Sequence, residues 1–363
     1  MKRLLVTLAA VALLAAAGAA AWGWWAVTTP YRGYPQAERR LDVASGSSVG
    51  RILARLEAEG VIRNALLARL WLAWRGDPPL QAGEYRFTGA LSLPAVLDKL
   101  VRGDVVHHQV TLVEGLTLEE KAAVLAAAGF GDRGLLLAAM RQPEPVADLD
   151  PAAEDLEGYL FPNTYRFPRG VTEDQIVATL VATFRKHWRQ AVEPLLAPGS
   201  QRTVREVVTL ASIVEKEARI AAERPLIAGV YANRLERGIA LYADPTVIFA
   251  LKKEGRWDGN IRRQDLAIDS PYNTYRYAGL PPGPIASPGL ASLLAAAEPA
   301  DVPYLYFVSR NDGSHVFSTT LAEHNRNVAR WQKRYWRDRA RERQGKADAG
   351  AGAGADADGR RLP

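Results

Sequence analysis

The sequence predicts an α+β protein with a single N-terminal transmembrane helix, a small α+β module and a larger α+β domain. An uncharged apolar run at residues 4–27 is long enough to span a bilayer. Short strand and helix signals alternate within residues 39–104, and residues 204–220 form the clearest amphipathic helix pattern. With 363 residues, 48% of them hydrophobic and 24% charged, the chain has the composition of a folded protein with two or three domains.

The apolar run has the flanks of a membrane anchor. Lys2 and Arg3 precede it, which favours a cytoplasmic N-terminus, and three tryptophans within residues 22–25 lie where an interfacial aromatic belt is expected. Everything after Tyr31 should then lie outside the cytoplasm. A cleaved signal peptide is the alternative, because residues 17–19 resemble a small-residue cleavage site, but the run is longer than a usual signal core.

Residue content excludes several kinds of chemistry. The chain has no cysteine, so thiol nucleophiles, disulfides and thiolate metal sites are ruled out. No zinc-protease, Walker or dinucleotide-binding pattern occurs, and we expect neither a metal nor a cofactor. The formal charge of +6 is spread along the chain, which indicates mild attraction to anionic polymers or lipids and no nucleic-acid binding.

Residues 39–104 carry the signals of a compact α+β module. Ser48 precedes the first helical stretch and suits a helix N-cap. Residues 46–50 (GSSVG) also match the nucleophile elbow of serine esterases, but the module is small and nothing assigns His107 or His108 to a triad. The expected elements are a strand at 41–43, helices at 49–59 and 66–75, a strand at 83–87 and a helix at 93–101.

Further elements follow beyond this module. Thr117 and Glu120 have the spacing of a capping box, and residues 311–313 (NDG) are a hairpin signal. From residue 346 onward the chain is rich in Ala, Gly and Asp, which predicts a disordered tail. The expected elements are a strand at 110–113, helices at 172–194, 204–220 and 246–252, strands at 304–309 and 315–318, and a helix that holds His324.

Glu215 is the candidate acid/base catalyst, because it falls on the apolar side of the 204–220 helix. At about 100° per residue it lies inside the apolar arc, whereas the other charged residues of the helix, Glu217 among them, lie outside the arc or at its edge. A carboxyl group in apolar surroundings has its pKa raised by desolvation, as a general acid requires. The apolar arc consists of Val204, Val207, Val208, Leu210, Ala211, Val214 and Ala218.

A structural role for Glu215 is the alternative, since Arg219 lies at i+4 and could pair with it. Glu217 is about 200° away around the helix, so the two glutamates do not face each other. A hydrolase that uses two carboxylates would therefore need a distant aspartate.

Several ordered sequence blocks resemble the endolytic murein transglycosylases, the YceG-like family. The signature is LASIVEKEA at residues 210–218, and the resemblance extends over about residues 40–335. Asn163 departs from the pattern, because we expect Asp there. The other blocks are EGLT at 114–117, EGYLFPNTY at 157–165, NRL at 233–235, DPTVI at 244–248, YNTY at 272–275, GLPPGPI at 279–285 and PYLYFV at 303–308.

The resemblance implies a lyase that cuts peptidoglycan glycan strands without metal or cofactor. The glutamate matching Glu215 would protonate the oxygen between N-acetylmuramic acid and N-acetylglucosamine and then act as base while the muramyl 6-hydroxyl attacks, which leaves a 1,6-anhydromuramic acid end. It also implies the following organisation: anchor 1–30, linker 31–38, LysM-like module 39–104, connecting region 105–170, catalytic domain 171–336 and tail 337–363.

The block around residue 273 is the candidate substrate groove. Tyr272, Asn273, Thr274 and Tyr275 combine aromatic rings for stacking on sugars with hydrogen-bonding groups. A half-buried strand is the alternative for any one of them. Residues 279–284 should form a rigid wall. Other candidates are Asp244 and Thr246, with helix capping favoured for Asp244 over a contact to Glu215, and His315 and His324 with either a substrate or a structural role.

The resemblance places the protein in the bacterial inner membrane, with its catalytic domain in the periplasm beside peptidoglycan synthases. Two other functions stay open. A non-catalytic scaffold would bind glycan without cutting it. A water-using muramidase would need a second carboxylate, for which Asp244, Asp265 and Asp269 are the candidates.

Overall fold

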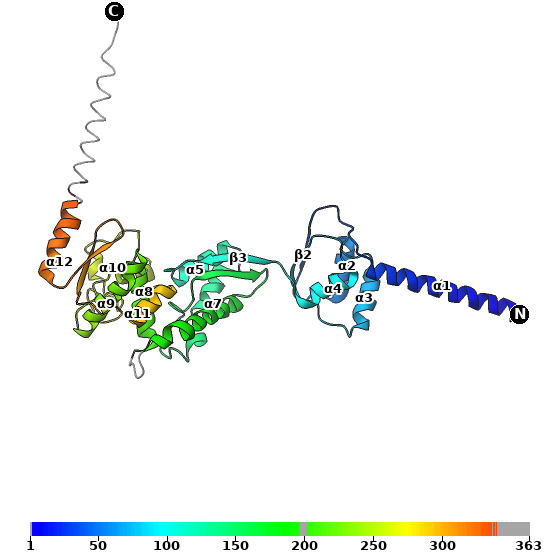
Figure 1. The fold of residues 1–363 in the computed structure, drawn as a ribbon, viewed down its shortest axis with the longest axis horizontal. Helices are drawn as coiled ribbons and strands as arrows, with labels where there is room; N and C mark the ends of the chain where they lie inside the picture. The colour runs from blue at the N-terminus through cyan, green and yellow to red at the C-terminus, as the bar shows by residue number, and fades with distance from the viewer. Residues whose placement is uncertain (1, 197–201, 336, 338, 340–363) are drawn as a thin grey trace, which may run out of the picture. The chain divides into compact units, whose positions relative to one another are not determined.

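The computed structural model describes residues 2–196, 202–335, 337 and 339, and these divide into two compact units (Figure 1). Residues 2–110 and 165–172 belong to the first unit, and residues 111–164 together with the described residues from 173 onward belong to the second. Helices and short two-stranded sheets occur throughout, which confirms the α+β class. Residues 111–164 thus pack with the C-terminal part. The predicted domain boundaries, including the connecting region at 105–170, stay predictions. The disordered stretch predicted from residue 346 onward lies outside the described residues.

The first unit begins with α1 (Lys2–Thr28), which is long and apolar enough to cross a membrane and is consistent with a single-pass anchor. The helix reaches the first unit's core with Val27, at its C-terminal end. The remaining elements are β1 (Arg39–Val43), α2 (Val49–Ala58), α3 (Ala65–Trp74), β2 (Gly83–Phe87) and α4 (Leu93–Arg102), all close to the predicted positions.

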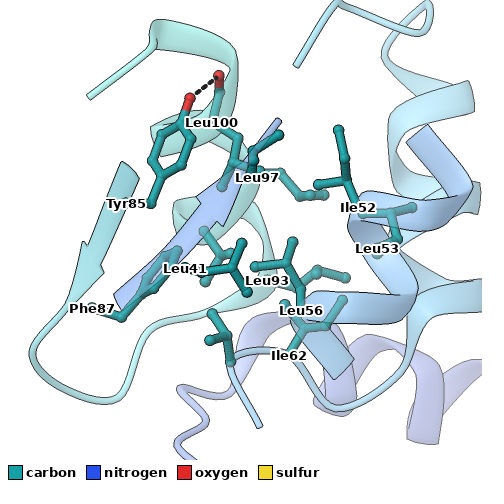
Figure 2. Close-up of a cluster of buried hydrophobic side chains, with 14 of the residues drawn as sticks. Leu41, Ile52, Leu53, Leu56, Ile62, Tyr85, Phe87, Leu93, Leu97 and Leu100 are labelled. Carbon is teal, nitrogen blue, oxygen red and sulfur yellow. Dashed lines mark hydrogen bonds between the residues drawn. The ribbon is translucent and has the colours of Figure 1, made fainter. Parts of the chain in front are cut away.

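Alternation of apolar and polar residues gives this unit its core. Strands β1 and β2 pair antiparallel, with Leu41 opposite Tyr85. Figure 2 shows leucines and isoleucines of α2 and α4 clustered with the side chains of these strands. It also shows the Tyr85 hydroxyl, which donates to the Leu100 carbonyl at 3.3 Å. Each such buried side chain stabilises the fold by about 1.5–3 kcal/mol. Ser48 accepts a hydrogen bond from the Arg51 amide, which confirms it as the N-cap of α2.

The second unit is mainly helical. Its helices are α5 (Leu118–Ala127), α6 (Arg133–Met140), α7 (Glu173–His187), α8 (Val204–Glu217), α9 (Arg224–Glu236), α10 (Asp244–Lys253), α11 (Leu290–Ala297) and α12 (Leu321–Val328). Strands β5 (Tyr306–Ser309) and β6 (His315–Ser318) form the predicted hairpin, with Ser309 opposite His315. Strands β3 (His107–Leu112) and β4 (Asn163–Pro168) form a further pair. The chain passes from one unit to the other within each of these two strands.

Local signals explain where the helices of the second unit begin. The predicted capping box of Thr117 and Glu120 is confirmed at α5. An equivalent box starts α8, where Thr203 and Glu206 bond each other's backbone amides at 2.8 and 3.2 Å. Both boxes satisfy amides that have no partner within the helix. The start of α8 is therefore fixed independently of the glutamates near its end.

Two predicted helices end differently in the structure. The helix expected to reach residue 220 stops at Glu217, because Ala218 is extended with φ −76° and ψ 120°. The helix expected over 172–194 is α7 to His187, followed by a π-helical turn at Trp188–Val192 and a 3₁₀ turn at Glu193–Leu195. The early stop of α8 leaves Glu217 on the last turn, where the chain changes direction.

Candidate active site

Glu215 on α8 lies among hydrogen-bond donors. Arg224 Nη2 donates to its Oε1 at 3.2 Å, while the Gly289 amide and Ser292 Oγ donate to its Oε2 at 3.0 and 2.7 Å. The side chain is 7% exposed, so the prediction that it faces inward is confirmed. The expected apolar surroundings are wrong, and the ion-pair partner is Arg224, not Arg219.

The Glu215 cluster joins three helices. Arg224 begins α9 and also donates from Nε to Ser292 Oγ on α11 at 3.0 Å. Its Nη2 lies 3.8 Å from Glu114 Oε2, so one guanidinium serves two carboxylates. Burial and, after it, the nearby Glu215 raise the pKa of Glu114, while Arg224 acts in the opposite direction. This arrangement ties α8, α9 and α11 together through charge-assisted hydrogen bonds.

A shallow groove of about 590 Å³ passes this cluster. Glu114 and Glu215 lie on it, and so does Asn163, whose Oδ1 accepts from the Thr164 amide at 2.8 Å. Both Glu215 oxygens already have partners, which leaves Glu215 poorly placed to exchange a proton with a substrate.

Glu217 lies on the other side of α8 and lines a separate cavity of about 390 Å³. It is half-buried, and Tyr231 donates its hydroxyl to Glu217 Oε1 at 3.2 Å. The position of Glu217 outside the apolar arc or at its edge therefore did not predict that the side chain is half-buried at the wall of a cavity. The walls of the cavity also include Arg234, Tyr242, Asp244, Tyr275, Tyr306 and His324.

The cavity changes the acidity of Glu217. Burial and, after it, the negative charge of Asp244 raise the pKa of Glu217 to about 7, while the Tyr231 hydrogen bond and Arg234 act to lower it. A carboxyl group with this pKa exists in both protonation states near neutral pH. It can therefore give a proton and take one back, which is the property that sequence reasoning sought in Glu215.

Asp244 is the carboxylate beside Glu217. It is the first residue of α10 and makes no side-chain capping bond there, so the predicted capping role is wrong. Tyr275 donates its hydroxyl to Asp244 Oδ1 at 2.6 Å. Of the other two aspartates considered for a two-carboxylate mechanism, Asp265 accepts from the Arg262 amide and Asp269 from the Tyr277 hydroxyl, and neither lines this cavity.

Aromatic rings form much of the cavity wall. Tyr242 and Tyr275 meet edge to face with centroids 5.3 Å apart, and Tyr306 stacks on His324 at 5.2 Å. Arg234 is held by the Leu305 and Leu241 carbonyls at 2.7 and 2.6 Å, with its guanidinium over the rings of Tyr242 and Tyr306. Such a wall offers apolar ring faces next to hydrogen-bonding groups, as a sugar requires.

The two histidines differ in their surroundings. His324 Nδ1 is buried and bonds to nothing in the described residues, and burial followed by the charge of Arg234 lowers the pKa of this imidazole. The imidazole is therefore neutral at pH 7, and its ring lines the cavity while Nδ1 itself is buried. His315, on strand β6 of the hairpin, instead forms a hydrogen bond between its Nδ1 and Glu223 Oε2 at 2.7 Å. Within the described residues no three His, Cys, Asp or Glu side chains are placed to hold a metal ion.

The residues predicted to bind substrate separate into two groups. Asp244 and Tyr275 line the Glu217 cavity. Thr246 and Thr274 are buried, and their hydroxyls form a hydrogen bond with each other at 2.9 Å. Asn273 Nδ2 donates to the Leu266 and Ile268 carbonyls at 3.0 and 2.8 Å. These three shape the turn that carries Tyr275.

Tyr272 also lies away from Glu217. Its ring packs on Phe249 at 4.9 Å and borders a small hollow with Asp155 and Pro282. The proposed wall at residues 279–284 thus adjoins this hollow. Sequence reasoning missed Tyr231, Arg234, Tyr242 and Tyr306, although Arg234 and Tyr306 stand within the family-like blocks at 233–235 and 303–308.

Comparisons with known proteins identify relatives of this chain. The chain is 34% identical over 309 residues to an endolytic murein transglycosylase of Bacillus subtilis, covering 79% of this chain and 82% of that protein. It is 30% identical to an endolytic murein transglycosylase of Streptococcus pneumoniae, covering 80% of this chain and 57% of the longer relative. A crystal structure of a YceG-like protein from Listeria monocytogenes matches with a TM-score of 0.54 at 33% identity, over 80% of this chain and 98% of that one. A model of the YceG-like family matches residues 41–330, and the chain belongs to this family.

Proposed function

We propose that this protein is an endolytic peptidoglycan lytic transglycosylase whose acid/base catalyst is Glu217. The proposal rests above all on the Glu217 cavity, in which one carboxyl group has a pKa of about 7 next to sugar-sized aromatic walls. The names of the bacillar and pneumococcal relatives support the activity. Glu217 takes the role first assigned to Glu215 because Glu215 has no free oxygen for a substrate proton.

One carboxyl group is sufficient for the proposed reaction. Protonated Glu217 gives its proton to the glycosidic oxygen between N-acetylmuramic acid and N-acetylglucosamine, and the bond from that oxygen to the muramyl anomeric carbon breaks. The Glu217 carboxylate then accepts the proton of the muramyl 6-hydroxyl as its oxygen bonds the anomeric carbon. The products are a 1,6-anhydromuramic acid end and a free 4-hydroxyl, no water is consumed, and Glu217 regains its proton.

The surrounding groups have separate roles in this scheme. Asp244 keeps the pKa of Glu217 high and, as an anion, can stabilise positive charge at the anomeric carbon. Tyr275 orients Asp244 through its 2.6 Å hydrogen bond. Tyr242, Tyr306 and His324 are the groups we expect to contact the sugar rings, while Thr246, Asn273 and Thr274 act as positioning residues.

The rest of the chain suits an enzyme held at the membrane. We propose that α1 is a single-pass anchor in the inner membrane, with a cytoplasmic N-terminus and a periplasmic catalytic domain. The strand, helix, helix, strand order of β1, α2, α3 and β2 supports a LysM-like module that grips glycan. In this position the enzyme would cut nascent strands beside the peptidoglycan synthases and so terminate their elongation.

Product analysis tests the proposal. The full-length protein in detergent is incubated with uncrosslinked glycan strands beside its Glu217→Gln and Glu215→Gln variants, and products are identified by mass spectrometry. Anhydro-ended internal fragments that disappear with Glu217→Gln support the lyase and its catalyst. Reducing ends would identify a muramidase with Asp244 as second carboxylate, and retained glycan binding without products would identify a scaffold. Fragments lost only with Glu215→Gln would return the catalytic role to that residue.

A further inference from the structure

The outward face of α3 is apolar. Leu66, Leu70 and Trp74 are 67%, 58% and 76% exposed, and Ala73 lies exposed between them. At about 100° per residue these four side chains share one arc of the helix about 100° wide. Arg69 is the charged residue beside the arc, and it is paired with Asp77. An exposed arc of this kind on a short helix marks an interaction surface.

The opposite face of α3 is apolar as well. Ala68 and Leu72 are buried in the core of the first unit together with Val27 of α1. Apart from Arg69, helix α3 is therefore apolar all round, whereas a helix on a water-exposed surface carries polar residues on its outer face. Burial in the unit's own core explains only Ala68 and Leu72. The exposed arc needs a second apolar environment.

The structure fixes α3 to the end of the membrane-spanning helix. The guanidinium of Arg63, just before α3, lies 4.5 Å from the ring centroids of both Trp25 and Tyr31. Figure 1 shows α3 beside the point where α1 enters the first unit, and the two helices are in contact. Trp24, in the same turn of α1 as Trp25, is 70% exposed, as expected for a residue of an interfacial belt.

We propose that the face of α3 formed by Leu66, Leu70, Ala73 and Trp74 lies in the interfacial layer of the phospholipid bilayer that α1 crosses. The inference rests on the proposed membrane anchor. Because α1 is covalently joined to the first unit and its end lies next to α3, a bilayer crossed by α1 is held close to α3. The effective concentration of lipid at this face is therefore very high. Trp74 has the amphipathic ring that favours the headgroup level of a bilayer.

The consequence is a defined orientation of the first unit. A single transmembrane helix alone leaves the domain that follows it free to tilt. A second contact through α3 fixes the tilt, and with it the height of the first unit above the membrane. The contact acts as an interfacial helix beside a spanning one, and its strength depends on lipid composition.

The absence of cysteine allows a direct test with single labels. Leu70→Cys, Ala54→Cys and Leu14→Cys are each coupled to an environment-sensitive fluorophore in the full-length protein. Ala54 lies exposed on α2 and serves as the matched control, and Leu14 lies within α1 and tests the anchor. The proteins are placed in two sets of vesicles of phosphatidylethanolamine and phosphatidylglycerol, one with a lipid spin-labelled in the headgroup region and one with a lipid spin-labelled near the end of its acyl chain.

The inference predicts strong quenching of position 70 by the headgroup label, strong quenching of position 14 by the acyl-chain label, and little quenching of position 54 by either. Quenching at 14 without quenching at 70 would overturn the α3 contact and leave the anchor intact. No quenching at 14 would overturn the anchor and, with it, the α3 contact. A label at 70 that is shielded from aqueous iodide but not quenched by lipid would show that a protein surface covers α3, which also contradicts the proposal.

Discussion

Glu215 and Glu217 lie two positions apart on α8, and their carboxylates occupy opposite environments. Glu215 accepts three hydrogen bonds, one of them from Arg224, and Glu217 accepts one from Tyr231 at the wall of an aromatic cavity. The first arrangement holds helices together, and the second leaves a carboxyl group available for proton transfer. The same helix thus separates a positioning glutamate from the proposed catalytic one.

The pH dependence of cleavage should follow the pKa of Glu217. The general acid must be protonated in the free enzyme, so kcat/KM should fall as pH rises through about 7. In Asp244→Asn the negative charge that raises this pKa is gone, while an oxygen remains for Tyr275. The descending limb should therefore move to lower pH, which initial rates on glycan strands between pH 5 and 9 would measure.

Asp269→Asn is the matched control for that experiment. Asp269 also accepts a tyrosine hydroxyl, from Tyr277, but does not line the cavity. Its profile should coincide with that of the unchanged protein. An Asp244→Asn profile with an unmoved descending limb would contradict the assignment of that limb to Glu217.

The helical pattern of residues 204–220 correctly predicted that Glu215 faces inward, but it could not predict the surroundings of Glu217. It indicated that Glu215 faces inward, and the side chain is 7% exposed. It could not indicate what meets Glu215 there, because the Gly289 amide and Ser292 lie 74 and 77 residues further along the chain. A period of 3.6 residues describes one helix and carries no information about its neighbours.

Glu217 was missed for the same physical reason. Its position relative to the apolar arc suggested a solvated side chain, but the walls that half-bury it come from α9, α10, the turn at Tyr275 and β5. By contrast, the β5–β6 hairpin and the caps at Ser48 and Thr117 were predictable, because each depends on residues close together in sequence. Local sequence signals therefore determine where helices and hairpins form, whereas contacts between distant segments of the chain create the candidate site.

The free energy of unfolding should depend on the protonation state of Glu217. Because its pKa in the folded protein is about 7 and its ordinary value is 4.5, the protonated form is favoured by folding. The contribution of protonated Glu217 to the free energy of unfolding is fully present below about pH 4.5 and is lost as pH rises through about 7. Glu217→Gln carries no charge, so at pH 8 it should be more stable than the unchanged protein by up to about 3 kcal/mol.

Thermal unfolding at pH 5 and pH 8 measures this difference. The Tm advantage of Glu217→Gln should be small at pH 5 and larger at pH 8. Equal Tm differences at the two pH values would show that Glu217 does not titrate between them in the folded protein.

The Glu215–Arg224 pair should contribute to stability. The side chains of Glu215 and Arg224 are 7% and 12% exposed, so removal of one partner leaves the other buried and incompletely paired. We expect Glu215→Ala to lower the free energy of unfolding by about 3 kcal/mol. Glu215→Ala with Arg224→Ala should cost less than the sum of the two single changes, as measured by urea unfolding. Additive losses would show that the pair is not coupled.

Tyr242 should bind glycan at the mouth of the cavity. It is 51% exposed, meets Tyr275 edge to face and has a positive φ of 49°, so its ring is presented to solvent at some backbone cost. Tyr242→Ala should raise KM for glycan strands about five- to tenfold, the value of one stacking contact of about 1 kcal/mol, with little change in Tm. Tyr277→Ala is the control, because Tyr277 is 44% exposed and lies outside the cavity. Equal effects of the two substitutions on KM would place the glycan elsewhere.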